Sequence, residues 1–169
     1  MLLPDSVVVI LRTLNERGYE AFAVGGCVRD MLLRRVPQDW DVCTSALPDQ
    51  IVACFPDRRT MDIGMRHGTV GVVIEGALYE ITTYRIDGAY SDRRRPDRVE
   101  FSASLLDDLA RRDFTINAMA YHPAAGLIDP HGGAEDLRKR KIRCVGRAEA
   151  RFDEDALRIV RALRFASRL

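Results

Sequence analysis

The chain has 169 residues, of which 47% are hydrophobic and 30% are charged, a composition typical of a globular protein with a buried core. Its 26 basic and 25 acidic side chains nearly cancel to a net charge of +1, so overall charge gives no argument for nucleic-acid binding. The apolar run over residues 7–11 is too short to cross a bilayer, and we expect no membrane partner. Four cysteines without C-x-x-C spacing fit reduced thiols in a cytoplasmic protein.

Apolar periodicity and turn residues predict alternating helices and strands in the first half of the chain. The expected helices cover residues 5–17, 29–35 and 48–55, and the expected strands cover 20–24, 40–43, 69–74 and 77–84, the last two as an antiparallel hairpin. The second half is expected to hold an arginine-rich polar loop over 87–96 and helices over 104–112, 113–121, 134–138 and 154–169. The last helix is apolar on much of its surface, which indicates the start of a second, helical domain.

Asp39 and Asp41 are the candidate metal ligands. Side chains two residues apart on a strand point to the same face, so the two carboxylates are expected to converge. Carboxylates without neighbouring His or Cys suit Mg2+ rather than zinc. A third carboxylate would complete a two-metal site; Glu80 is our candidate, and an ordinary surface glutamate is the equal alternative.

Two blocks of residues offer contacts for a nucleotide. A glycine turn opens a helix whose N-terminus can hold phosphate, where Gly26 allows close backbone approach and Arg29 can neutralise charge. The alternative for Arg29 is an ordinary surface pair with Asp30. The second block, residues 111–118, suits a ribose and phosphates, but equally a capping and ion-pair arrangement. Its candidate nucleotide-binding residues are Arg112, Asp113 and Asn117.

Asp155 and Arg158 are one helical turn apart and are candidates for reading a base. A carboxylate accepts from an exocyclic amine and a guanidinium donates to a ring nitrogen, which is the pattern of cytosine and adenine but not of guanine and uracil. Such a pair would select C and A without a nucleic-acid template. Arg161 and Arg164 continue the line of arginines. The alternative for Asp155 and Arg158 is a surface salt bridge of little energetic value.

Five blocks in this order resemble the class II CCA-adding tRNA nucleotidyltransferases and the bacterial poly(A) polymerases, members of the polymerase-β-like nucleotidyltransferase superfamily. The blocks lie at residues 25–30, 39–44, 79–85, 111–118 and 154–158. The resemblance implies an α+β fold, with a small mixed sheet flanked by helices. It places a nucleotidyltransferase head at residues 1–145 and the start of an all-α neck at residues 146–169.

The resemblance also implies roles for the candidate residues. Asp39 and Asp41 would hold Mg2+, while Gly26, Arg29 and Arg112 would contact the incoming nucleotide. Asp155 and Arg158 would read its base, with Arg161 and Arg164 close by. The expected reaction adds C, C and A to the 3′ end of tRNA from CTP and ATP. The arginine-rich loop is similar to the family's flexible loop, which favours adenosine addition.

Other functions stay open at this point. A poly(A) polymerase or an enzyme that adds only A shares the same head, and CTP incorporation separates them from the first function. An inactive fragment that binds nucleotide or RNA, without the family's helical tRNA-binding body, would bind ATP without forming product. A transferase acting on a small molecule such as an aminoglycoside is disfavoured, because it has no need to choose between bases.

Overall fold

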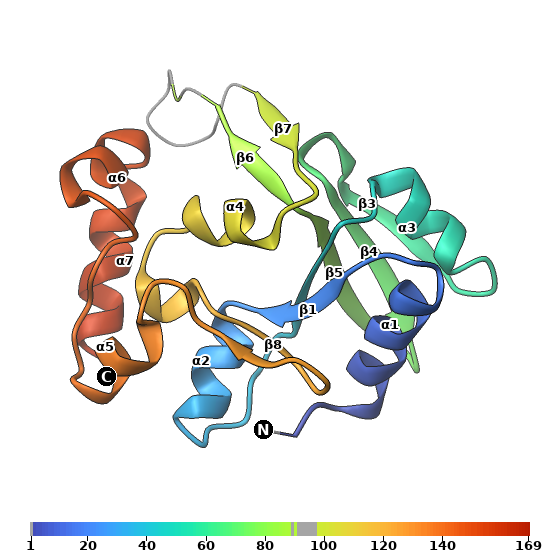
Figure 1. Cartoon of the computed structure of the whole chain (residues 1–169), viewed down its shortest axis with the longest axis horizontal. Coiled ribbons are helices and arrows are strands. Elements are labelled where there is room, and N and C mark those ends of the chain that lie inside the picture. Colours follow the sequence, from blue (N-terminus) through green and yellow to red (C-terminus); the bar gives the residue numbers. More distant parts are fainter. Residues whose placement is uncertain (1, 89, 91–97) are drawn as a thin grey trace.

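The structure of the chain is a computed structural model that describes residues 2–88, 90 and 98–169 (Figure 1). Its centre is a seven-stranded sheet with the strand order β3-β4-β5-β2-β1-β8-β9. The strands are β1 (Ala21–Val24), β2 (Asp41–Thr44), β3 (Thr60–Gly64), β4 (Thr69–Ile74), β5 (Ala77–Thr83), β8 (Ala120–His122) and β9 (Gly126–Ile128). Only β2 and β5 pair in parallel among these neighbours, so the sheet is mixed, as predicted.

The remaining elements flank this sheet. The helices are α1 (Asp5–Glu16), α2 (Gly26–Leu32), α3 (Pro48–Cys54), α4 (Leu105–Ala110), α5 (Gly133–Arg138), α6 (Ala148–Glu154) and α7 (Leu157–Ala166). Two short 3-10 helices cover Met65–His67 and Thr115–Asn117, and a separate two-stranded ribbon pairs β6 (Arg85–Asp87) with β7 (Val99–Phe101). The predicted arginine-rich loop over residues 87–96 falls mostly outside the described residues. No helix of the described part is long and apolar enough to span a membrane.

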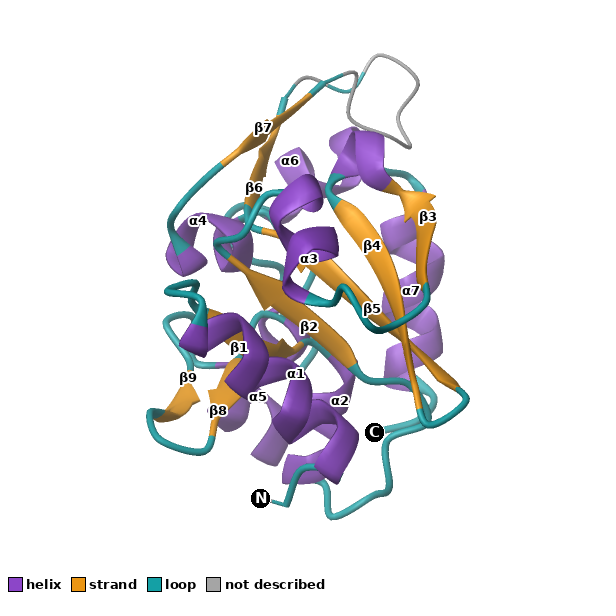
Figure 2. Ribbon diagram, turned by 90° about the vertical axis from the view of Figure 1, so that its right-hand side faces the viewer, coloured by secondary structure: helices purple, strands orange, loops and turns teal. Residues whose placement is uncertain are grey.

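Alternating side chains of the central strands divide the core into two layers. On β1, Ala21 and Ala23 face the larger cluster that α1, α2 and α3 cover, whereas Val24 faces a smaller cluster under α4. Val42 and Cys43 of β2 divide in the same way. In Figure 2, α1 and α3 accordingly lie together on one side of the sheet, whereas Leu105 and Leu109 of α4 cover the other face. Cover on both faces holds the central strands, and the residues at their ends, in place.

The C-terminal helices pack beside α5 and α2 rather than on the sheet (Figure 1). Phe165 of α7 is buried and meets Phe114 edge-on, with ring centroids 5.8 Å apart. Leu137 of α5 and Ile116 belong to the same apolar cluster. Four other apolar residues of α7 are exposed, which agrees with the predicted apolar surface. These are Leu157, Ile159, Val160 and Leu163.

Several predicted elements differ from the structure. The predicted helix over 113–121 is wrong, because Phe114 pairs with Cys144, a 3-10 turn follows, and β8 then joins β1. The predicted helix over 154–169 is two helices, because Asp155 has an extended backbone and its carboxylate accepts the amide of Leu157. Strands β3, β6, β7 and β9 were not predicted.

Candidate active site

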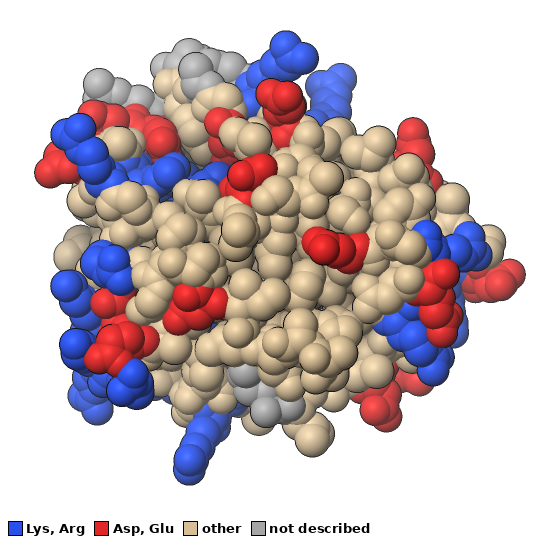
Figure 3. All heavy atoms as spheres, in the orientation of Figure 1, with Lys and Arg blue, Asp and Glu red and all other residues tan. Residues whose placement is uncertain are grey.

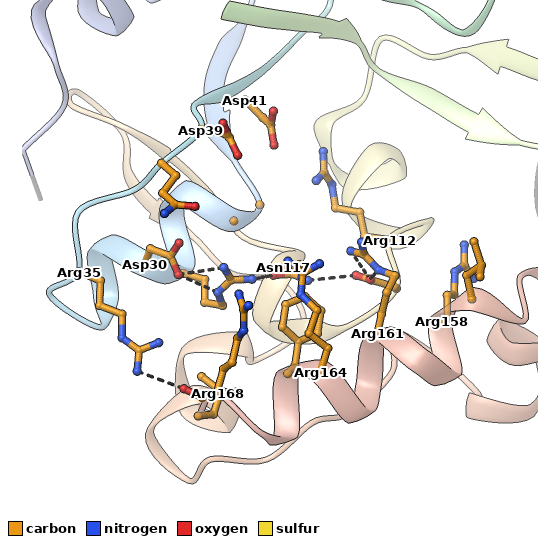
Figure 4. A pocket seen from close by; sticks show the side chains of 18 of the residues that line it. Asp30, Arg35, Asp39, Asp41, Arg112, Asn117, Arg158, Arg161, Arg164 and Arg168 are labelled. Atoms are coloured by element: carbon orange, nitrogen blue, oxygen red, sulfur yellow. Dashed lines mark hydrogen bonds and ion pairs between the residues drawn. The ribbon is translucent and has the colours of Figure 1, made fainter.

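A cavity of about 800 Å3 lies between the glycine turn before α2, the start of β2, and α7. Most of the predicted site residues line it: Gly26, Arg29, Asp39, Asp41, Arg112, Asp113, Asn117, Asp155, Arg158, Arg161 and Arg164. Figure 4 shows Asp39 and Asp41 across the cavity from the arginines of α7. Figure 3 shows charged side chains around the rim of one face, with Lys and Arg gathered on the side of α5 and α7. The cavity therefore has an acidic wall facing a basic wall.

The acidic wall is built where β2 begins. Asp41 is the first residue of β2, and Asp39 lies in the bend before it, rather than on the strand as predicted. The parallel pairing of β2 with β5 sets Glu80 directly opposite Asp41. Glu80 is exposed and does not line the cavity. Its predicted catalytic role therefore rests on its position beside the aspartate pair.

The carboxylates of this wall disfavour one another's charge. Burial by the surrounding protein raises the pKa of Asp41 above its usual value; Arg112 opposes this, and Asp39 adds to it. Burial and the charges of Asp41 and Asp39 raise the pKa of Glu80 as well. A cation placed between these groups would relieve the repulsion. The donor chemistry thus fits a hard divalent cation held by Asp39 and Asp41.

Among the residues that the structure describes, no group of three or more His, Cys, Asp or Glu side chains lies together in a form that could hold a metal ion. Within the described part of the molecule, the predicted metal ligands are thus two carboxylates, Asp39 and Asp41, without a third ligand grouped with them.

The four cysteines are free and buried, and burial raises the pKa of Cys27 to about 11.

Arg112 is held against the glycine turn by a buried carboxylate. Asp108 of α4 is fully buried and accepts from Arg112 Nη2 at 2.8 Å and from Arg111 Nη2 at 2.7 Å. Burial alone would raise the pKa of Asp108, but Arg112 and Arg111 outweigh it and keep that pKa below its usual value. Gly25 has φ +78°, and a Cβ added there would lie 3.0 Å from Arg112 Nη1. The turn therefore favours glycine for its backbone, and any larger residue there would also displace the Arg112 guanidinium.

Arg29 is fixed from three sides. Its Nη1 donates to Asn117 Oδ1 at 2.7 Å, and its Nε and Nη2 donate to Asp30 Oδ1 at 3.0 and 2.9 Å. Its guanidinium also lies 5.1 Å from the centroid of the Phe165 ring. Arg29 therefore pairs with Asp30, as the alternative interpretation expected, and it also lines the cavity. Because these donors are already fixed, little side-chain conformational entropy is lost when they bind an anion.

Guanidinium groups from α2 and α7 lie over the ring of Phe165. Besides Arg29, Arg161 and Arg164 lie over it at 5.5 and 6.0 Å from the centroid. Arg161 Nε also donates to Asp113 Oδ2 at 2.7 Å. Sequence reasoning missed Phe165, although its place next to Arg164, one turn after Arg161, is a usable signal. It also missed Asp108, whose spacing of three and four residues from the two arginines favours ion pairs.

Asp155 and Arg158 line the cavity but do not form a salt bridge with each other. Arg158 Nη1 donates to Glu154 Oε2 at 2.5 Å and to the Arg151 carbonyl at 3.1 Å. Asp155 Oδ1 accepts the amide of Leu157, the first residue of α7, at 2.9 Å, a local turn in which an aspartate side chain bonds the backbone two residues on. Asp155 and Arg158 thus line the same cavity, but each is hydrogen-bonded to a different partner rather than to the other.

Comparisons with known proteins agree with this geometry. Residues 21–143 match the family described as the Poly A polymerase head domain. The chain is 58% identical over 160 residues to the CCA-adding enzyme of Geobacillus thermodenitrificans strain NG80-2, covering 95% of this chain and 39% of that enzyme. It is 53% identical over 160 residues to the CCA-adding enzyme of Lactobacillus johnsonii, covering 95% of this chain and 40% of that enzyme.

Solved structures give the same result. The crystal structure of Bacillus stearothermophilus CCA-adding enzyme in complex with CTP matches with a TM-score of 0.88 and 48% identity, over 98% of this chain and 40% of that chain. The Thermotoga maritima CCA-adding enzyme complexed with tRNA matches with a TM-score of 0.75 and 26% identity, over 99% of this chain and 39% of that chain. The chain spans about two fifths of the length of these relatives.

Proposed function

Because the chain belongs to the poly(A) polymerase head-domain family, we propose that it is the catalytic head of a template-independent RNA nucleotidyltransferase. The proposed reaction adds C, C and A to the 3′ end of tRNA from CTP and ATP. The observation that carries the proposal is the cavity itself, where Asp39 and Asp41 face the arginines of α7. Metal-binding carboxylates opposite fixed guanidinium groups suit transfer from a nucleoside triphosphate.

In this reaction the 3′-hydroxyl oxygen of the RNA attacks the α-phosphorus of the nucleotide. The bond from that phosphorus to the oxygen bridging to the β-phosphate breaks, pyrophosphate leaves with the electron pair, and the hydroxyl proton is lost to solvent. Asp39 and Asp41 would hold Mg2+, which when bound polarises the phosphate and makes the hydroxyl more acidic. Arg29 and Arg112 would neutralise phosphate charge, each already oriented by a carboxylate.

The remaining predicted residues would position the nucleotide. Asp113 and Asn117 orient the arginines beside them, since Asp113 accepts from Arg161 and Asn117 accepts from Arg29. Asp155 and Arg158 would read the base, with the carboxylate accepting from the exocyclic amine of C or A. Glu80 would add negative charge beside the metal. We also propose that the protein acts in the cytoplasm, which suits its four free thiols.

Extension of a tRNA that lacks its 3′ CCA tests this function. The 169-residue chain is incubated with Mg2+ and with CTP, ATP or both, and the products are resolved to single nucleotides. We expect ordered addition of C, C and A. Addition of A alone would instead identify an A-adding enzyme or a poly(A) polymerase. Nucleotide binding without any product would identify an inactive binding fragment and contradict catalysis by this chain.

A further inference from the structure

The arginines that line the cavity fall into two groups. Eight arginines line it, and five of them have a carboxylate partner. The paired ones are Arg29 with Asp30, Arg111 and Arg112 with Asp108, Arg158 with Glu154, and Arg161 with Asp113. The other three, Arg35, Arg164 and Arg168, have no carboxylate partner among the residues that the structure describes. We call these three the outer arginine cluster.

The outer arginine cluster lies at one end of the cavity. Arg35 follows α2, Arg164 lies near the end of α7, and Arg168 follows α7. Arg35 Nη2 donates to the carbonyl oxygen of Arg168 at 3.2 Å, which joins the two segments. Figure 4 shows Arg158, Arg161 and Arg164 in this order along α7 and Arg168 just past its end, with Arg35 beside Arg168. The uncompensated positive charge is thus at the end opposite Arg158.

The two ends of the cavity therefore differ in their charged groups. Asp155 and Arg158, the base-reading pair, flank the start of α7, and Arg168 lies two residues past its end; at the helical rise, the ten residues from Arg158 to Arg168 span about 15 Å. That length is comparable with an extended nucleoside triphosphate. A nucleotide with its base at Arg158 and its α-phosphate facing Asp41 would point its terminal phosphates toward Arg168. Three guanidinium groups without carboxylates repel one another until an anion joins them, and phosphate accepts from guanidinium in a bidentate way.

We propose that Arg35, Arg164 and Arg168 form the subsite for the terminal phosphates of the incoming nucleotide, the part that leaves as pyrophosphate. This inference rests on the proposed function and extends it to Arg35 and Arg168. The five paired arginines keep their carboxylates, so Arg29 and Arg112 orient the phosphates that they meet while adding little net positive charge. The outer arginine cluster supplies the net positive charge that distinguishes a triphosphate from a monophosphate.

Titration calorimetry on the 169-residue chain tests the proposal with CTP, CMP and inorganic pyrophosphate in Mg2+ buffer. The test variant is Arg35→Gln with Arg168→Gln. The matched control is Arg34→Gln, because Arg34 is exposed, adjacent in sequence and outside the cavity lining. We expect the double variant to bind CTP and pyrophosphate at least about tenfold more weakly, with CMP affinity within about twofold of wild type. A double lysine variant should recover part of the loss, because it keeps the charge.

The outcomes separate this inference from the proposed function. A wild-type chain that binds no nucleotide would contradict the function, and the inference would fall with it. A wild-type chain that binds CTP, with a double variant of equal affinity and an equal melting temperature, would overturn the inference alone. A short oligoribonucleotide is titrated in parallel. A double variant that loses affinity for this RNA but keeps CTP and pyrophosphate would assign the cluster to RNA phosphodiesters and also overturn the inference.

Discussion

Arg161 of α7 and Asp113 of the segment after α4 are joined by a charged hydrogen bond, Nε to Oδ2, of 2.7 Å. The other oxygen of the same carboxylate accepts from the Phe114 amide at 2.8 Å and from Asn117 Nδ2 at 3.3 Å. Asn117 in turn accepts from Arg29. The buried carboxylate of Asp113 therefore links Arg161 of α7 to Asn117 and, through Asn117, to Arg29 of α2.

Replacing Asp113 by alanine should loosen this link. The change leaves a buried backbone amide without its acceptor and frees Arg161, so we expect a loss of about 2 kcal/mol in the free energy of unfolding. Nucleotide affinity should fall as well. Chemical denaturation checks the first effect. Glu16→Ala is the control, because its pair with Arg12 is exposed at 3.8 Å, and its loss should stay within about 0.5 kcal/mol. Equal stability of the two variants would contradict the link.

Two glycines with positive φ offer a matched test of the glycine turn. Alanine at Gly25 carries backbone strain and would also press on Arg112, whereas alanine at Gly18, with φ +85°, meets nothing within 4 Å. Both variants should lose about 1–2 kcal/mol of stability from the backbone. Only Gly25→Ala should also weaken CTP binding in calorimetry. A similar loss of CTP affinity in Gly18→Ala would show that the effect is not local.

The acidic wall should reduce stability when no metal is present. A carboxyl whose pKa is raised in the folded state favours unfolding when it is ionised, and this penalty disappears as the pH falls through the raised pKa. Asp41→Asn should therefore raise the melting temperature at pH 7 in metal-free buffer. The gain should shrink toward acidic pH, where Asp41 itself becomes neutral. Asp57→Asn, at an exposed residue outside the cavity, is the control. A lower melting temperature for Asp41→Asn at pH 7 would contradict this account.

Base selection should depend on the charge of Asp155. Asparagine there keeps an oxygen that can accept the Leu157 amide, so the hydrogen bond at the start of α7 should persist. It weakens the acceptor offered to an exocyclic amine. We expect Asp155→Asn to lose several-fold affinity for CTP and ATP, with GTP and UTP unchanged, when all four are compared by calorimetry. Asp153→Asn, exposed and outside the cavity lining, should bind as wild type does. Unchanged selectivity in Asp155→Asn would rule out the base-reading role.

The sequence predicted the parts of the site that depend on short-range signals. The glycine turn, the Asp39 and Asp41 pair and the hairpin that carries Glu80 all have local patterns of spacing or residue type. The segment over residues 113–121 does not, because its apolar run fits a helix and only pairing with distant residues makes it a turn and a strand. Gly25, for example, donates its amide to the Met119 carbonyl across more than ninety residues of chain.

The partners of the arginines were equally hard to predict. The spacing of Asp155 and Arg158 suggested a mutual pair, but Glu154 lies one full turn from Arg158 and takes its guanidinium instead. The backbone break at Asp155 turns its carboxylate toward the next helix. Phe165 could be predicted as buried, but its contact with Arg29 depends on how α7 packs against α2. Such contacts follow from tertiary packing, which a local pattern does not contain.

Transfer of labelled CMP from CTP to a tRNA lacking its 3′ CCA tests the central claim most directly, when it is measured for wild type, Asp39→Asn with Asp41→Asn, and Asp57→Asn. We predict incorporation by wild type and by Asp57→Asn, and none by the double variant, with all three proteins folded. Incorporation by the double variant at the wild-type rate would contradict the claim that the aspartate pair supports nucleotidyl transfer in this cavity.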